Sequence, residues 1–141
     1  MSKRPKGIDP KLWGRAAWSL LYRSAVHDPS GKLTKSILRF YACLLPCAKC
    51  RRFTRQYIRT YGLESHTPFE LVYLLHKTVA CKTQACIPTC EQLKDRYYNY
   101  GSDVAESAVR LFLEFVKNNA KARNKSHRYE SLVRLLDVFE G

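Results

Sequence analysis

Two cysteines, Cys47 and Cys50, stand two residues apart in the stretch LPCAKCRRF, after a proline and before two arginines. Such a CxxC pair can form a redox-active disulfide, supply half of a zinc site, or simply pack in a basic protein. At the start of a helix, the first thiol would lie among unpaired backbone N–H groups at the positive end of the dipole. Together with the charges of Lys49, Arg51 and Arg52, this position would favour the reactive thiolate.

The elements that must position these cysteines are helices. Apolar residues recur at helical spacing, which predicts helices at about residues 10–27, 34–44, 47–62, 68–79 and 104–116 and a last one after the segment AKARNKSH. Thr67 with Glu70, and Asp103 with Glu106, have the spacing of capping boxes, and Thr89 can cap a short helix. No alternating run is long enough for a sheet, so we expect an all-α fold, a small helical bundle.

Length and composition are those of one globular domain. The chain has 141 residues, of which 45% are apolar, enough for a core without disulfide staples. No stretch approaches the roughly 18 apolar residues of a membrane span. The basic N-terminus MSKRPKGIDP has no apolar segment behind it, unlike a secretory signal. We therefore expect a protein that is not secreted.

The net charge of +13 is unevenly distributed. No acidic residue occurs between Asp28 and Glu64, whereas eight basic ones do: Lys32, Lys35, Arg39, Lys49, Arg51, Arg52, Arg55 and Arg59. Such a block favours an anionic partner, such as nucleic acid, a phosphate or an acidic protein. A solvated basic face that binds nothing would have the same composition.

Six cysteines without a secretory signal indicate redox chemistry or a metal site. A thioredoxin fold would need strands around the CxxC, and none is predicted. The zinc-ligand candidates are Cys43, Cys47, Cys50, His76, Cys81, Cys86 and Cys90. Because the later cysteines in CKTQACIPTC form no second CxxC, their spacing gives zinc little support.

The stretch WGRAAW places two tryptophans, Trp13 and Trp18, on the helix that precedes the cysteines. Tryptophans most often pack in a core. A glycine in mid-helix costs about 1 kcal/mol relative to alanine. Gly14 therefore suggests that the backbone must stay bare there, for example beneath a flat ligand.

These motifs together resemble the Erv/ALR flavin-linked sulfhydryl oxidases. The resemblance rests on LWGRAAWSLLY, LPCAKCRRF and LLHKTV in this order, covers about Leu12 to Cys90, and is strongest to the short members from large cytoplasmic DNA viruses, poxviruses and iridoviruses among them. It implies a four-helix core plus a short helix that binds FAD beside the CxxC. It also implies oxidation of protein dithiols to disulfides, with electrons passed through flavin to oxygen to give peroxide.

The resemblance also assigns roles to individual residues. Cys50 would face the flavin and Cys47 would exchange with the substrate. The implied cofactor-binding residues are Gly14, Arg15, Trp18, Tyr22, His76, Val79 and Lys82. His76 and Val79 match the first and fourth positions of the family motif HNxVN, while Tyr22 stands where the family usually has histidine.

The chain departs from the family pattern at several positions. Lys77 and Ala80 replace the two asparagines of HNxVN. The usual structural disulfide has no partner cysteine here, so Cys86 with Cys90 is the candidate for a second disulfide. Cys43 and Cys81 are expected to be free and buried.

The resemblance divides the chain into a basic flexible segment (1–8), an oxidase core (9–100) and a C-terminal helical extension (101–141), packed on the core or at a dimer surface. It implies a homodimer in the cytoplasm of a host cell, either free or virion-associated, with a protein dithiol or a thioredoxin-like carrier as partner. The alternative from a different class is a basic nucleic-acid or virion-associated helical protein with structural or zinc-binding cysteines. A third hypothesis is an Erv-like fold that has lost flavin.

Overall fold

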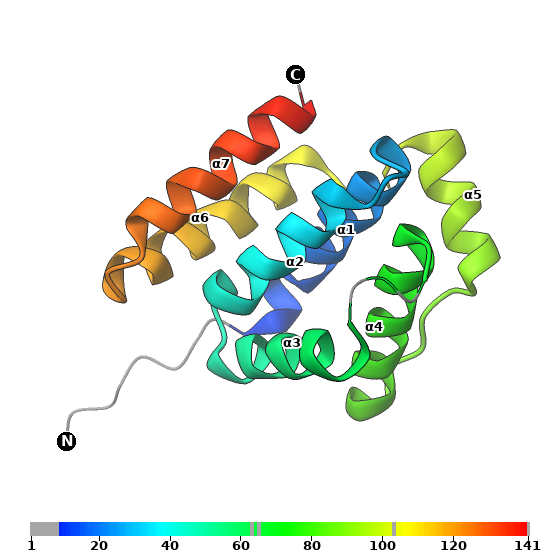
Figure 1. The fold of residues 1–141 in the computed structure, drawn as a ribbon, viewed down its shortest axis with the longest axis horizontal. Coiled ribbons are helices and arrows are strands. Elements are labelled where there is room, and N and C mark those ends of the chain that lie inside the picture. Colours follow the sequence, from blue (N-terminus) through cyan, green and yellow to red (C-terminus); the bar gives the residue numbers. More distant parts are fainter. Residues whose placement is uncertain (1–8, 63, 65, 103, 141) are drawn as a thin grey trace.

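In the computed structural model, which describes residues 9–62, 64, 66–102 and 104–140, all regular structure is helical (Figure 1). After the short 3-10 helix η1 (Pro10–Leu12), the chain forms α1 (Gly14–His27), α2 (Lys32–Leu44), α3 (Ala48–Tyr61), α4 (Pro68–Thr83), α5 (Cys90–Tyr100), α6 (Glu106–Ala122) and α7 (Ser126–Glu140). The predicted all-α class is confirmed. The proposed basic segment 1–8 lies outside the described residues.

Two of the predicted helix caps are present. The Thr67 hydroxyl accepts a hydrogen bond from the Glu70 backbone N–H at 3.4 Å and donates one to the Glu70 carboxylate at 2.6 Å. At the start of α5, Thr89 and Gln92 each bond the other's backbone N–H through their side chains, which completes a capping box. Local sequence signals therefore fix where α4 and α5 begin.

Four helix starts differ from the prediction. One is that of α7, which begins at Ser126, inside the segment AKARNKSH after which it was expected. Asp9 caps the short η1, through a bond from the Lys11 N–H at 3.0 Å, and α1 begins only at Gly14. The second helix starts two residues earlier than expected, at Lys32. The expected box between Asp103 and Glu106 is wrong as a helix start, because the N-cap of α6 is Ala105; Asp103 itself lies outside the described residues.

Helix α1 lies at the centre of the bundle, where it contacts α2, α4, α5 and α6 (Figure 1). Its inward side chains Leu20, Leu21 and Tyr22 are each at most 2% exposed. The Tyr41 hydroxyl of α2 donates a hydrogen bond to the Ala17 carbonyl at 2.8 Å, which ties the two helices together. This central position lets α1 present residues to the helices on both of its sides.

The C-terminal helices pack on the rest of the bundle. Helix α6 contacts α1 and α2, and α7 contacts α2 and α6. Phe112 of α6 is fully buried and its ring stacks on Trp13, with centroids 5.6 Å apart. An ion pair of 3.3 Å between Arg23 and Glu106 also joins α1 to α6. Helices α1 and α6 therefore share one hydrophobic core.

Within the described part of the chain, no helix has both the length and the apolar character needed to cross a membrane.

Candidate functional site

The redox candidates Cys47 and Cys50 lie at the start of α3. The residue before Pro46 cannot easily stay helical, so the chain leaves α2 at Leu45 and turns. Cys47 is the N-cap of α3, with extended backbone (φ −157°, ψ 115°), and its Sγ accepts a bond from the Cys50 N–H at 3.3 Å. Both residues are partly buried free thiols. The predicted placement of the CxxC at a helix N-terminus is confirmed.

The environment of Cys50 disfavours its thiolate in the dithiol form. Burial, together with a hydrogen bond to Cys47 and the charge of that neighbour, raises the pKa of Cys50 from 9.0 to about 12. A backbone N–H and the charge of Arg51 act in the opposite direction, but they are the smaller effects. The basic residues after the CxxC therefore do not make Cys50 a thiolate at neutral pH; their proposed help for Cys47 stays a prediction.

Arg51 is held by the end of α2. Its guanidinium donates to the Leu45 carbonyl at 2.6 Å and to the Asn119 side chain of α6 at 3.3 Å. Arg123 donates in the same way to the Cys43 carbonyl at 2.7 Å. Burial and the nearby charge of Arg123 lower the pKa of Arg51. Both arginines thus satisfy carbonyls at the end of α2. Arg51 links α3 to that end, and Arg123 links the end of α6 to it.

Three of the predicted flavin contacts meet between α1 and α4. The Trp18 and His76 rings stack with centroids 4.3 Å apart and planes 19° apart. The Tyr22 hydroxyl and His76 Nδ1 are joined by a hydrogen bond of 2.8 Å. Tyr22 is 1% exposed and stacks in turn on Tyr97 of α5. Trp18, Tyr22 and His76 therefore form one aromatic cluster, and its contact with a flavin stays a prediction.

Lys82 lies near the CxxC. Its ammonium stands 4.4 Å from the centroid of the Phe53 ring, a cation–π contact. Phe53 follows Cys50 by three residues on α3, so the two side chains are neighbours on the helix surface. The contact links a side chain in the last turn of α4, the helix that carries His76, to the helix of the redox pair.

The other residues predicted to contact the flavin are Gly14, Arg15 and Val79. Gly14 is the first residue of α1, and a Cβ added there would meet nothing within 4 Å, so the expectation of a mid-helix glycine is wrong. Arg15 is exposed, and its guanidinium makes no hydrogen bond or ion pair with the residues that the structure describes. Val79 is half-buried against the core. The flavin roles of these three residues stay predictions.

The other cysteines are also free thiols. Cys86 is exposed in the loop before α5 and Cys90 is half-buried at its start, so their pairing stays a prediction. Cys81 is exposed, which makes the expectation that it is buried wrong, while Cys43 is half-buried. Among the described residues, no three His, Cys, Asp or Glu side chains are grouped so as to hold a metal ion.

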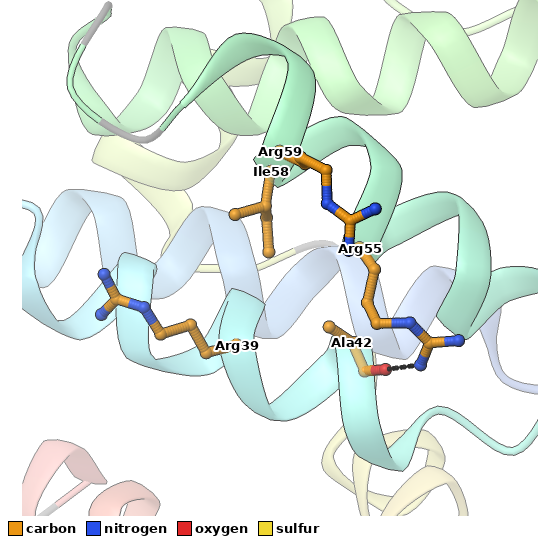
Figure 2. Close-up of a pocket in the computed structure, with 5 residues that line it drawn as sticks. All are labelled: Arg39, Ala42, Arg55, Ile58 and Arg59. Atoms are coloured by element: carbon orange, nitrogen blue, oxygen red, sulfur yellow. Dashed lines mark hydrogen bonds between the residues drawn. The ribbon is translucent and has the colours of Figure 1, made fainter.

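Two cavities lie away from the aromatic cluster. One of about 290 Å³ is lined by Arg39, Ala42, Arg55, Ile58 and Arg59, between α2 and α3 (Figure 2). A smaller one of about 110 Å³ is lined by Ser30, Gly31, Lys35, Glu64, His66, Pro68 and Leu71. Neither is at the site predicted for the cofactor.

Sequence reasoning missed Phe53, Tyr97 and the arginine-lined cavity. A signal for Phe53 was present, since a residue three positions after a helical cysteine shares its face. Two arginines of the cavity, Arg55 and Arg59, also belong to the series 47, 51, 55 and 59, which starts at Cys47 and advances in steps of four. Nothing local indicated Tyr97, because its contact with Tyr22 depends on how α5 packs on α1.

Comparison with known proteins gives one relative. No protein-family model matches the chain, and no solved structure matches it. The chain is 36% identical over 63 residues to 096R of Invertebrate iridescent virus 3, a protein whose name provisionally describes it as an FAD-linked sulfhydryl oxidase. The match covers 40% of this chain and 43% of the relative, so the chain spans less than half of that protein's length.

Proposed function

We propose that the chain is an FAD-linked thiol oxidase that forms disulfides in protein substrates. The observation that carries the proposal is the position of Cys47 and Cys50 at the start of α3, where Phe53 contacts Lys82 at the end of α4. Helix α4 also carries His76 of the aromatic cluster. The similarity to the viral relative supports the same function.

The proposed exchange begins with Cys47 and Cys50 joined as a disulfide. A substrate thiolate attacks the Cys47 sulfur, the S–S bond breaks, and the Cys50 sulfur leaves. Because its pKa is raised to about 12, Cys50 takes up a proton and becomes a thiol. The second substrate thiolate then attacks the substrate sulfur of the mixed disulfide and releases Cys47, which is protonated. The substrate loses two electrons and two protons, and the CxxC pair gains them.

The side chains between α1 and α4 suit a flavin in their chemistry. Trp18 and His76 offer stacked ring faces, and the Tyr22 hydroxyl helps to orient His76 through its hydrogen bond. Arg15 and Lys82 offer positive charge for the phosphates, with Gly14 and Val79 as the other expected contacts. FAD, when bound, would take the two electrons of the CxxC dithiol and pass them to oxygen, giving hydrogen peroxide.

The purified protein tests the proposal directly. It should show flavin absorbance and consume oxygen with dithiothreitol, and Cys47→Ser or Cys50→Ser should abolish turnover. Cys81→Ser is a matched control, because this exposed cysteine lies outside the CxxC and should be dispensable. A colourless protein that consumes no oxygen, or full turnover in Cys50→Ser, would refute the function.

The proposal also covers the redox partners, the oligomeric state and the location of the protein. A protein dithiol or a thioredoxin-like carrier would deliver electrons to Cys47, oxygen would accept them, and the chain would act as a homodimer in the cytoplasm of a host cell, with or without attachment to a virion. Size-exclusion chromatography with light scattering would test the dimer.

A further inference from the structure

The larger cavity combines an apolar floor with arginine side chains. Ala42 and Ile58 form its apolar part. Arg39 of α2 stands on one side of Ile58, while Arg55 and Arg59 of α3 stand on the other (Figure 2). With a volume of about 290 Å³, it can accept a side chain or a small anionic group rather than a large cofactor.

No acidic residue that the structure describes forms an ion pair with the arginines of this cavity. None of the lining residues is acidic. Arg55 donates one hydrogen bond to the Ala42 carbonyl at 2.8 Å, whereas the side chains of Arg39 and Arg59 make no hydrogen bond or ion pair with any residue that the structure describes. Glu64, the first acidic residue after this block, pairs with Lys35 at 2.7 Å. Guanidinium groups presented in this way suit a carboxylate or a phosphate.

The cavity lies farther along α3, the helix that begins at the exchange cysteine. Cys47, Arg51, Arg55 and Arg59 follow one another at intervals of four, so they form one row along α3. At 1.5 Å per residue, Arg55 lies about 12 Å and Arg59 about 18 Å along the helix from Cys47. The neighbouring row, from Cys50 to Phe53, is the one that Lys82 of α4 covers. The row that begins at Cys47 therefore leads to the arginines of the cavity, whereas the row that begins at Cys50 leads to Phe53 and Lys82.

We propose that the cavity lined by Arg39, Arg55 and Arg59 docks acidic side chains of the protein dithiol whose cysteine reacts at Cys47, an inference that rests on the proposed thiol oxidation. An extended chain spans about 3.4 Å per residue, so the acidic residues should lie about four to five positions from the reacting cysteine. A single-stranded nucleic acid fits the cavity less well, because no aromatic side chain lines it to stack a base.

Two synthetic peptides test the docking. Each carries one Cys-x-x-Cys dithiol; one has Asp and Glu four and five residues from the first cysteine, and the other has Asn and Gln there. The flavin-loaded protein should oxidise the acidic peptide with a kcat/KM about three- to tenfold higher at low salt, and the preference should fade at high salt. The neutral peptide serves as the internal reference for every variant.

The matched variants remove the same charge in two places. The double variant Arg39→Gln with Arg59→Gln should abolish the preference for the acidic peptide. These two side chains make no hydrogen bond or ion pair with any residue that the structure describes, so the replacement breaks no such bond. Arg110→Gln with Lys117→Gln removes two exposed charges from α6 and should keep the preference intact. Circular dichroism confirms that each variant is folded.

The possible outcomes separate the two proposals. Equal kcat/KM for the two peptides, with oxidation intact, would overturn the docking site and leave the thiol oxidase standing. Failure to oxidise either peptide or dithiothreitol would refute the oxidase; fluorescence anisotropy with a Cys→Ser acidic peptide would still measure docking itself. If the Arg39/Arg59 variant lost binding to a labelled single-stranded DNA but kept the peptide preference, the cavity would be a nucleic-acid site and the docking proposal would be wrong.

Discussion

Alkylation of Cys50 in the reduced, flavin-free protein is expected to be slow at neutral pH and to accelerate steeply in alkali. Only the thiolate attacks iodoacetamide. Because burial and the neighbouring Cys47 raise the pKa of Cys50 from 9.0 to about 12, the thiolate forms at a higher pH than in an ordinary cysteine. Cys50 should therefore be alkylated more slowly than an ordinary cysteine at pH 8. Its alkylation rate should continue to rise at a pH at which the rate of an ordinary thiol has levelled off.

The size of the effect follows from the rise of the Cys50 pKa from 9.0 to about 12. At pH 8 a thiol of pKa 12 is about 10⁻⁴ ionised, against about 10⁻¹ for one of pKa 9, a roughly thousandfold deficit. A more basic thiolate is intrinsically more nucleophilic, with a Brønsted slope of about 0.4–0.5, which returns about fifteen- to thirtyfold. Cys50 should therefore react about thirty- to sixtyfold more slowly than an unperturbed cysteine at pH 8.

Isotope-coded iodoacetamide pulses, read by peptide mass spectrometry under argon, measure each cysteine separately. The Cys50 rate should rise about a hundredfold from pH 8 to 10, whereas an ordinary thiol gains only about tenfold. Steric burial slows the reaction equally at every pH, so the slope separates it from ionisation. Exposed Cys81 monitors the reagent, and Cys50 in urea supplies the unfolded reference. In Cys47→Ser burial remains, so the Cys50 pKa should fall only part of the way. A plateau of the wild-type rate near pH 9 would refute the reasoning.

Four substitutions test other parts of the structure. Gly14→Ala should leave thermal stability unchanged or raise it by up to about 1 kcal/mol, since its Cβ meets nothing within 4 Å, yet it should lower the flavin absorbance per mole of protein; normal flavin content would remove this residue from the cofactor site. Tyr22→Phe removes the bond to His76 and should cost about 0.5–1.5 kcal/mol in urea unfolding, with an unchanged midpoint counting against the bond. Gly31→Ala should lose at least about 1–2 kcal/mol, because its φ is +84° and a Cβ would lie 3.0 Å from the ring of the proline that opens α4. Gln84→Gly relieves the same left-handed backbone at φ 56° and should stabilise instead; loss in both variants would contradict the backbone argument.

Features that depend on neighbouring residues were predictable from the sequence. The all-α class followed from helical spacing, and the starts of α4 and α5 followed from their capping residues Thr67 and Thr89. The position of Cys47 at a helix start followed from Pro46, which prevents the preceding helix from continuing. Each of these rests on contacts within about one helical turn, which a single sequence displays directly.

Features that depend on packing were not predictable from the same patterns. The pKa of Cys50 is set mainly by how deeply the bundle buries it, and this outweighs the arginine charge that the sequence shows. Gly14 looked like a mid-helix residue because the sequence of η1 and α1 reads as one continuous helix. In the structure η1 is a separate 3-10 turn between Asp9 and Trp13, so α1 begins at Gly14. The meeting of Trp18 with His76 was reachable only through the family resemblance, since the two residues lie on different helices.

The altered α4 motif bears on cofactor affinity more than on redox chemistry. Ala80, in place of the second asparagine of HNxVN, is 5% exposed and packs as a small core residue, while Lys77, in place of the first, is exposed to solvent. Compared with that motif, α4 lacks two polar amides. It still forms the Trp18–His76 stack, whose 4.3 Å separation leaves no space for a third ring between the two. A flavin would therefore contact an outer face of the stack rather than enter it. Its binding would then depend on stacking and on positive charge such as Lys82, which predicts an affinity more sensitive to salt than one held by amide hydrogen bonds.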